Sequence, residues 1–263
     1  MKNALIGYSG YVGSSLLRQH VFENLYRSSN IGEITSKAFD LVVCAAAPAK
    51  KWIANKEPGE DLKNIENLIS HLATIDCGKF ILISTVDVFN DPHGVSEKTG
   101  VKEEGLHPYG LHRRMLEKFV EEHFKDYLII RLPGLVGPGL RKNVIFDFRN
   151  GNNLHAIDSR GLFQFYPMVN LWADIKLAIE SKLKLLHLTA EPLGVSEIAE
   201  ACFGMSFHQL AAGTPARYDF RSDYAGLFGG KGFYQYSKRE SILAIRAYAQ
   251  SEPLALRREG DLK

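Results

Sequence analysis

The feature that most constrains the fold is a set of three glycines that directly follows a short apolar run near the start of the chain. The run Ala4-Leu5-Ile6 leads into Gly7, Gly10 and Gly13, and a helical pattern follows over 14–17. The first glycine permits a tight turn, the second lets the backbone approach a ligand, and the third lets a helix pack close to the strand. Amides at the start of that helix then face an anion. The pattern therefore predicts a strand, a glycine-rich turn and a helix that together hold the pyrophosphate of a nucleotide cofactor.

Apolar runs of strand length recur along the chain, with helical patterns between them. The expected strands are 4–6, 41–44, 80–83, 128–130 and 184–188, and the expected helices between them are 14–22, 59–72 and 109–123. This alternation predicts an α/β fold with a doubly wound parallel sheet, covered by helices on both faces and connected by right-handed crossovers. Ligands bind such sheets at the carboxyl ends of the strands, so site residues should follow these runs.

The second half of the chain has a different texture, rich in glycine, proline and aromatic residues from about Gly134 onward. One clear helix is expected over 195–202, entered after Pro192 and ended by Gly204, and 219–236 is expected to be a loop. We predict a cofactor-binding domain over 1–140. The part over 141–263 is predicted to be mostly a smaller, less regular substrate lobe, with some segments that return to the main sheet.

Composition and charge narrow the class of protein. The 263 residues are 45% hydrophobic and 24% charged, with a formal net charge of +2, so charge gives no reason to expect binding to nucleic acid or to a membrane. Cys44, Cys77 and Cys202 lie far apart and form no CxxC pair, which argues against disulfides and against a metal site. No apolar run approaches the roughly 18 residues that span a bilayer, and the first apolar run is too short for a signal peptide. We expect a cytoplasmic protein without a metal.

A second group of candidate cofactor residues, Arg27 and Ser28, lies at the end of a further expected strand over 24–29. An acidic residue near this point binds the 2′-hydroxyl of the NAD ribose, whereas an arginine suits the 2′-phosphate of NADP. Arg27 therefore favours NADP over NAD, although it could equally be a solvated surface residue.

Two further segments carry hydroxyl groups at positions suited to chemistry. Ser84 and Thr85 follow the expected strand 80–83, where a hydroxyl can bond a substrate carbonyl or satisfy local backbone. Tyr109 and Arg113 lie four residues apart on one face of the expected helix 109–123. A phenol has a pKa near 10, so it works as an acid-base group at pH 7 only if a nearby cation stabilises its anion, and Arg113 could supply that charge.

Together these segments resemble the extended short-chain dehydrogenase/reductase family of NAD(P)-dependent nucleotide-sugar epimerases, dehydratases and ketoreductases. The turn 7–13 is similar to the GxxGxxG turn of that family, and 109–113 is similar to its YxxxK helix. The other similar segments are 39–47, Asn64, 84–89, and 131–133 with 137–139. The resemblance implies a Rossmann fold and, by analogy with the family, a homodimer.

The resemblance also implies roles for individual residues. Thr85 would bond the substrate oxygen and Tyr109 would donate or accept its proton, while hydride passes between the nicotinamide and the substrate carbon. Further cofactor contacts are expected at Tyr11, Val12, Ala45, Ala46, Ala47, Ser84, Pro133 and Leu135. Asn143, Gln164 and Tyr166 are expected to face the sugar nucleotide.

The chain departs from the family pattern at three places. Arg113 stands where the motif has lysine, and a planar guanidinium is not equivalent to a compact ammonium that grips the nicotinamide ribose. Only residues 29–38 separate Ser28 from the next strand, so a strand-helix unit must be shortened or absent there. Asp87 occupies the position of a dehydratase base, but its neighbour is Val86 instead of an acid, which argues against elimination; Asp87 could instead bind sugar hydroxyls.

The hypothesis that best fits these residues is an NADP-dependent reductase of a nucleotide-linked keto-sugar. Its setting in surface-polysaccharide or deoxysugar synthesis is implied by the resemblance alone. One alternative is a nucleotide-sugar epimerase with a tightly held NAD(P). Another, suggested by Arg113, is a non-catalytic NAD(P)-binding regulatory or assembly protein with a degenerate site.

Overall fold

A six-stranded parallel sheet forms the centre of the molecule. The computed structural model describes residues 2–254, and its main sheet has the strand order β10-β6-β4-β3-β1-β2, with every neighbouring pair parallel. The strands are β1 Asn3–Ile6, β2 Asn24–Tyr26, β3 Ala38–Cys44, β4 Asp76–Thr85, β6 Tyr127–Leu132 and β10 Leu185–His187. This is the doubly wound, Rossmann-type sheet that the alternating pattern predicts.

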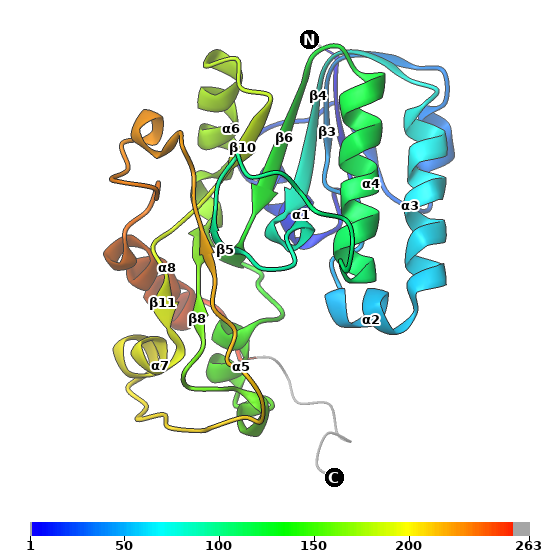
Figure 1. Cartoon of the computed structure of the whole chain (residues 1–263). Helices are drawn as coiled ribbons and strands as arrows, with labels where there is room; N and C mark the ends of the chain where they lie inside the picture. Colours follow the sequence, from blue (N-terminus) through cyan, green and yellow to red (C-terminus); the bar gives the residue numbers. More distant parts are fainter. Residues whose placement is uncertain (1, 255–263) are drawn as a thin grey trace.

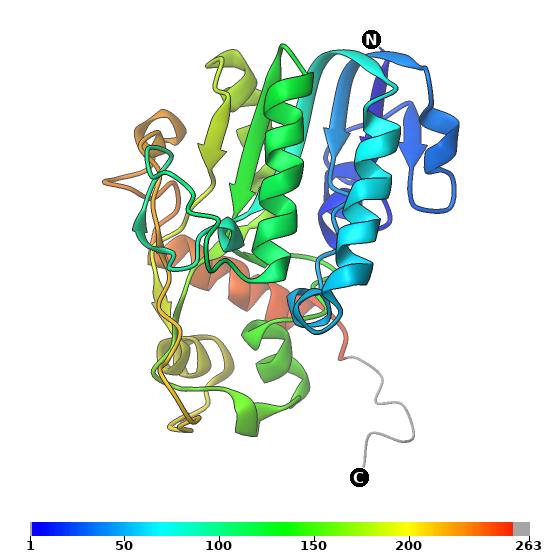
Figure 2. The same cartoon turned by 45° about the vertical axis from the view of Figure 1, so that its right-hand side comes forward.

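Helices cover both faces of the sheet. On one face, α3 Pro58–Leu72 and α4 Pro108–His123 lie side by side and pack on an apolar cluster that includes Ile65, Leu116 and Phe80 (Figures 1 and 2). On the other face, α1 Tyr11–Leu17 and α6 Leu171–Glu180 pack on a second cluster. Each strand sends alternate side chains into the two clusters, which explains why the strands read as continuous apolar runs.

The strand order reverses between β1 and β3. From β1 the chain runs outward to the edge strand β2 and then returns to β3 on the other side of β1. The turn after β1 is tied to both neighbours, because the Gly7 amide donates to the Tyr26 carbonyl (2.8 Å) and the Ala45 amide donates to the Ile6 carbonyl (2.8 Å). Ligands of open α/β sheets bind outside the carboxyl ends of the strands at such a reversal point.

Most of the chain beyond residue 140 lies past the carboxyl ends of the strands, below the main sheet in the view of Figure 1. Its helices α5 Val144–Asn150, α7 Val195–Phe203 and α8 Lys238–Ser251 enclose a separate apolar cluster. Short strand pairs complete it: β7 Gly134–Val136 with β9 Phe165–Pro167, β8 Leu162–Phe163 with β11 Leu193–Gly194, and β5 His93–Val95 with β12 Asp219–Phe220. Helix α6 and strand β10 come from the same part of the chain, but β10 is an edge strand of the main sheet and α6 packs on one of its faces.

Several local predictions need correction. The first helix begins at Tyr11 and ends at Leu17, short of the expected 22, because Gln19 bonds the Ser15 carbonyl (3.1 Å) and His20 stacks on Trp172 (4.0 Å between ring centres). Ser84 and Thr85 are the last residues of β4 and do not follow it. The expected loop 219–236 also contains β12 and the 3₁₀ helix Ala225–Phe228.

The expected shortening after Ser28 is confirmed. Only a four-residue 3₁₀ helix, Ile31–Ile34, lies between β2 and β3. A short α2, Lys51–Lys56, follows β3 and leads into α3. Within residues 2–254, no helix combines the length and the apolar character needed to span a bilayer.

Candidate active site

The glycine turn has the shape of a cofactor cradle. A Cβ on Gly7 would lie 2.4 Å from the Ala45 carbonyl oxygen, and one on Gly13 would lie 2.1 Å from the Gly7 carbonyl oxygen, so both positions exclude any side chain. Gly10 differs, because the nearest atom to a Cβ there would be the Gly7 oxygen at 3.4 Å. Its open side leaves a space that a side chain would fill, which fits the close approach of a pyrophosphate.

Tyr11 and Val12, the other expected contacts in this turn, open helix α1. The Tyr11 hydroxyl donates to the Gly137 carbonyl (3.2 Å), so it joins the turn to the segment that follows β7. Burial raises the pKa of this phenol above its ordinary value. Tyr11 is therefore a link between the two parts of the chain, and Val12 is half-buried against the apolar cluster under α1.

Arg27 and Ser28 lie at the exposed carboxyl end of β2, beside the glycine turn. The Arg27 guanidinium carbon lies 5.8 Å from the centre of the Tyr8 ring, and its Nε donates to the Ser29 hydroxyl (2.9 Å). The sequence places a cation here, and the fold puts it next to the turn.

The half-buried Ala45, Ala46 and Ala47 follow β3 and pack against the two apolar clusters of the sheet. Pro133 is buried between β6 and β7, and Leu135 in β7 is partly exposed. These residues lie at the carboxyl ends of β3 and β6, where the resemblance expects the cofactor-facing residues.

Thr85 and Tyr109 meet at the carboxyl end of β4. Thr85 ends β4 and Tyr109 lies in the first turn of α4, close enough that the Thr85 hydroxyl acts to lower the pKa of Tyr109. The Thr85 hydroxyl also accepts the Asp87 amide (3.1 Å). The Tyr109 amide also donates to the Asn55 side chain (3.0 Å), which fixes the start of the helix. Burial raises the pKa of Tyr109 to about 12, and the nearby Arg113 charge offsets part of that rise. The phenol therefore holds its proton at neutral pH.

Arg113 is buried behind Tyr109 and bound by Asp61. Its two terminal nitrogens bond the two Asp61 oxygens, Nη2 to Oδ1 at 2.9 Å and Nη1 to Oδ2, and Nη2 also donates to the Pro48 carbonyl. The guanidinium carbon lies 4.0 Å from the centre of the Tyr109 ring. His112 adds a third contact to the same carboxylate, 2.7 Å from its Nδ1 to Oδ2. Although burial acts to raise the pKa of Asp61, the bonds from Arg113 and His112 lower it below its usual value.

Sequence reasoning missed Asp61. The resemblance directs attention to Asn64, but Asn64 is exposed on α3, and Asp61, one turn earlier, is the residue that reaches α4. An acid in the first turn of a helix is ordinary, so no local signal marks Asp61.

Asp87 lies in the 3₁₀ turn Val86–Val88, directly after β4. Its carboxylate pairs with Lys51 (2.7 Å), and its negative charge, added to burial, raises the pKa of Tyr218 from the other part of the chain. Lys142, from the second part of the chain, donates to the Ala49 carbonyl in the loop after β3. Lysines from both parts of the chain, Lys51 and Lys142, therefore lie near the carboxyl ends of the strands. Lys51, Tyr218 and Lys142 were not predicted from the sequence.

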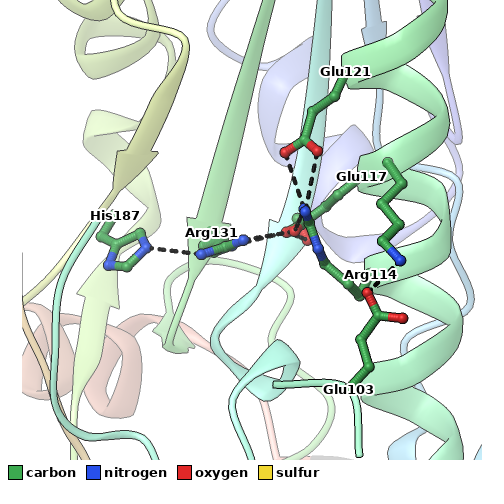
Figure 3. A network of polar contacts seen from close by, with 8 residues as sticks. Glu103, Arg114, Glu117, Glu121, Arg131 and His187 are labelled. Carbon is green, nitrogen blue, oxygen red and sulfur yellow. Dashed lines mark hydrogen bonds and ion pairs between the residues drawn. The ribbon is translucent and has the colours of Figure 1, made fainter. Parts of the chain in front are cut away.

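The Ser84 hydroxyl belongs to a buried polar network around Glu117 and Arg131, and Figure 3 shows those two residues. The Ser84 hydroxyl donates to Glu117 Oε1 (2.6 Å), Glu117 is paired with Arg131, and Arg131 Nη1 lies 3.3 Å from His187 Nε2. Arg114 extends the network to the surface. Because Ser84 uses its proton on Glu117 and is only 8% exposed, the structure gives it a role in holding α4 on the sheet and not a direct cofactor contact.

Three residues expected to face a sugar nucleotide have structural roles instead. Gln164 is buried and bonds the backbone of Ala190 and Phe220 (2.6–2.7 Å). Tyr166 is fully buried and donates to Asp174 (2.5 Å). The Asn143 side chain caps α5 and donates to the Leu135 carbonyl (2.9 Å). Polar side chains in an irregular region resemble ligand contacts in sequence, but here groups inside the protein take up their hydrogen bonds.

No group of three or more His, Cys, Asp or Glu side chains suited to a metal ion occurs among residues 2–254.

Comparison with known proteins agrees with the fold and the order of these segments. A search of curated protein sequences gave no significant match. Among solved structures, the dTDP-4-dehydrorhamnose reductase of Bacillus anthracis in complex with NADP superposes with a TM-score of 0.72 at 18% identity, covering 96% of this chain and 99% of that chain. WbmG of Bordetella bronchiseptica in complex with NAD gives 0.73 at 14% identity, over 94% and 93%. The UDP-N-acetylglucosamine 4-epimerase of Methanobrevibacter ruminantium gives 0.72 at 15% identity, over 95% and 97%.

At these identities the superpositions establish the fold, and the sequence itself establishes the family. Residues 20–154, just over half of the chain, match the profile of the NAD dependent epimerase/dehydratase family. The matched region carries Thr85, Tyr109 and Arg113, and the resemblance seen in the sequence is confirmed. The chain belongs to the NAD dependent epimerase/dehydratase family.

Proposed function

We propose that this protein is an NADP-dependent reductase of a nucleotide-linked keto-sugar. The observation that carries the proposal is the pairing of Thr85 with Tyr109 at the carboxyl end of β4, beside a glycine turn whose open side fits a pyrophosphate. NADPH would lie along Gly7, Gly10 and Gly13, and it would supply the hydride and leave as NADP. Thr85 would bond the substrate carbonyl oxygen, and Tyr109 would deliver a proton to it.

The state of Tyr109 fits the role of proton donor. Reduction of a carbonyl needs a proton donor, and a buried phenol with its pKa raised to about 12 holds its proton at pH 7. Arg113, over the Tyr109 ring, stabilises the phenolate that forms when that proton leaves.

The surroundings of Asp87 argue against elimination. A dehydratase needs a free carboxylate base with an acidic partner, whereas Asp87 is paired with Lys51 at 2.7 Å and follows Val86. The preference for NADP rests on Arg27, whose positive charge beside the glycine turn suits a 2′-phosphate.

Turnover tests the proposal directly. With NADPH and a panel of nucleotide-linked 4-keto-6-deoxysugars, the wild-type protein should oxidise the cofactor with at least one substrate. Tyr109→Phe should lower kcat by about 10² to 10⁴-fold while NADPH still binds, because only the proton donor is lost. Full turnover by the Tyr109→Phe variant would show that the mechanism is wrong.

A nucleotide-sugar epimerase is the second candidate. It is favoured by the family match and by the epimerase of Methanobrevibacter ruminantium, which superposes as well as the reductase does. An epimerase returns its hydride to the sugar, so it would interconvert two nucleotide-sugars without net consumption of NADPH. Chromatography of the sugars alongside the absorbance of NADPH separates the two activities.

A further inference from the structure

Arg113 stands where the family motif has a lysine, and its charged end is already occupied. Its Nη1 and Nη2 bond both oxygens of Asp61, and Nη2 also bonds the Pro48 carbonyl. Arg113 and Asp61 are 2% and 5% exposed, so neither group is free to exchange its partner for water. A guanidinium held in this way is not available to grip a ribose as a free ammonium would.

The pairing depends on the planar shape of arginine. A guanidinium presents two parallel N–H groups that match the two oxygens of a carboxylate, whereas an ammonium is a point charge on a flexible stem. Asp61 also accepts a contact from His112 Nδ1 at 2.7 Å, so three nitrogens from α4 fix the orientation of one carboxylate on α3. The guanidinium is thereby fixed in both position and tilt.

The fixed guanidinium touches two parts of the candidate site. Its central carbon lies 4.0 Å from the centre of the Tyr109 ring, where a cation stabilises electron density on the ring and on a phenolate. Its bond to the Pro48 carbonyl holds the segment that directly follows Ala45, Ala46 and Ala47. One side chain thus connects α3, α4 and the loop after β3.

We propose that Asp61 is a positioning residue that adapts this site to arginine. It holds the Arg113 guanidinium over Tyr109 and against Pro48, so that Arg113 acts on the proton donor and on the cofactor-facing loop. The inference rests on the proposed function in its assignment of Tyr109 as the proton donor and of NADPH as the cofactor.

A pair of substitutions tests the proposal through cofactor binding. In Arg113→Lys, the remaining Asp61 draws the ammonium into a single ion pair and the Pro48 carbonyl loses its donor, so the NADPH Kd should rise about tenfold or more. Adding Asp61→Asn removes that pull and frees the lysine toward the cofactor. The double variant should bind NADPH at least about fivefold more tightly than Arg113→Lys alone, as measured by quenching of protein fluorescence.

Two controls make the rescue specific. Arg113→Lys combined with Glu121→Gln, which removes a carboxylate at the surface of α4, should bind NADPH as weakly as Arg113→Lys alone. Arg114→Gln, a neighbouring arginine paired with Glu117 and Glu121, should bind NADPH within about twofold of the wild type. The comparison does not need the Asp61→Asn single variant, in which Arg113 would be buried without a counterion.

The outcomes separate this inference from the proposed function. A double variant that binds NADPH no better than Arg113→Lys, or an Arg113→Lys variant that binds as well as the wild type, overturns the role of Asp61. Where a substrate is turned over, kcat should follow the same order as binding. A double variant that shows the rescue in NADPH binding, together with wild-type protein that reduces no keto-sugar, would contradict the proposed function and leave the role of Asp61 supported.

Discussion

Glu117 and Arg131 form a bidentate ion pair inside the molecule, with Arg131 Nε 2.9 Å from Oε1 and Nη2 2.7 Å from Oε2 (Figure 3). Glu117 lies on α4, two turns after Tyr109, and Arg131 lies on β6. Glu117 also accepts the Ser84 hydroxyl, one residue before Thr85. The pair therefore fixes the helix that carries Tyr109 against the strand that carries Thr85.

Removal of Glu117 should cost much stability. Glu117→Ala leaves Arg131 buried without a counterion, so the free energy of unfolding should fall by about 3–5 kcal/mol. Arg114→Gln breaks ion pairs that are partly solvated and should cost about 1 kcal/mol or less. Urea titrations of both variants measure the difference, and equal losses would contradict an essential role for the inner pair.

Stability should also depend on the protonation of His187. Burial, together with the charge of Arg131, lowers the pKa of His187 well below 6.5. In the unfolded chain His187 therefore takes up a proton near pH 6.5, while in the folded chain it does not. The stability that neutral His187 contributes is present above pH 6.5 and is lost as the pH falls below it.

The comparison with His187→Gln isolates that effect, because glutamine does not titrate. Between pH 7.5 and 5.5, the free energy of unfolding should fall by about 1.4 kcal/mol more in the wild type than in His187→Gln. The other histidines and carboxylates cancel in the difference. Parallel curves for the two proteins over this range would argue against a neutral, buried His187.

Two glycines of the turn should respond differently to alanine. Gly13→Ala places a Cβ 2.1 Å from the Gly7 carbonyl oxygen, so the variant should be destabilised as well as defective in NADPH binding. Gly10→Ala meets its nearest atom at 3.4 Å, so the melting temperature should change little while NADPH binding falls at least tenfold. Thermal unfolding and NADPH titration separate the two effects. Normal NADPH binding by Gly10→Ala would show that no cofactor approaches this side of the turn.

Arg27 should discriminate between the two cofactors. Arg27→Ala removes a charged partner of a 2′-phosphate, a loss of about 1.5–3 kcal/mol, so the NADPH Kd should rise about 10- to 100-fold while the NADH Kd changes less than about threefold. Arg160→Ala, an exposed arginine paired with Asp158 in the other part of the chain, serves as the matched control and should change neither. Equal effects of Arg27→Ala on both cofactors would remove the argument for NADP.

Local patterns in the sequence were sufficient for the fold and for the backbone of the site. Apolar runs and helical spacing predicted the strands of the main sheet and helices α3 and α4, because period and burial are properties of short segments. The spacing of Gly7, Gly10 and Gly13 predicted the turn, since the clashes that exclude a Cβ there follow from local backbone geometry. The relation of Thr85 to Tyr109 followed from the ordered family motifs.

Only the tertiary structure decided which polar groups are used up inside the protein. Gln164 and Ser84 look like ligand contacts in the sequence, but each is bonded to a residue at least 26 positions away, and Tyr166 is bonded to the buried Asp174. In the sequence, Arg113 is only a departure from the lysine of the family motif. In the structure, α3 places Asp61, 52 residues earlier in the chain, against it. The sequence by itself determined where the glycine turn and the Thr85 and Tyr109 segments lie. The partner of each buried charge depends on helix packing over long separations in the chain, which no local pattern encodes.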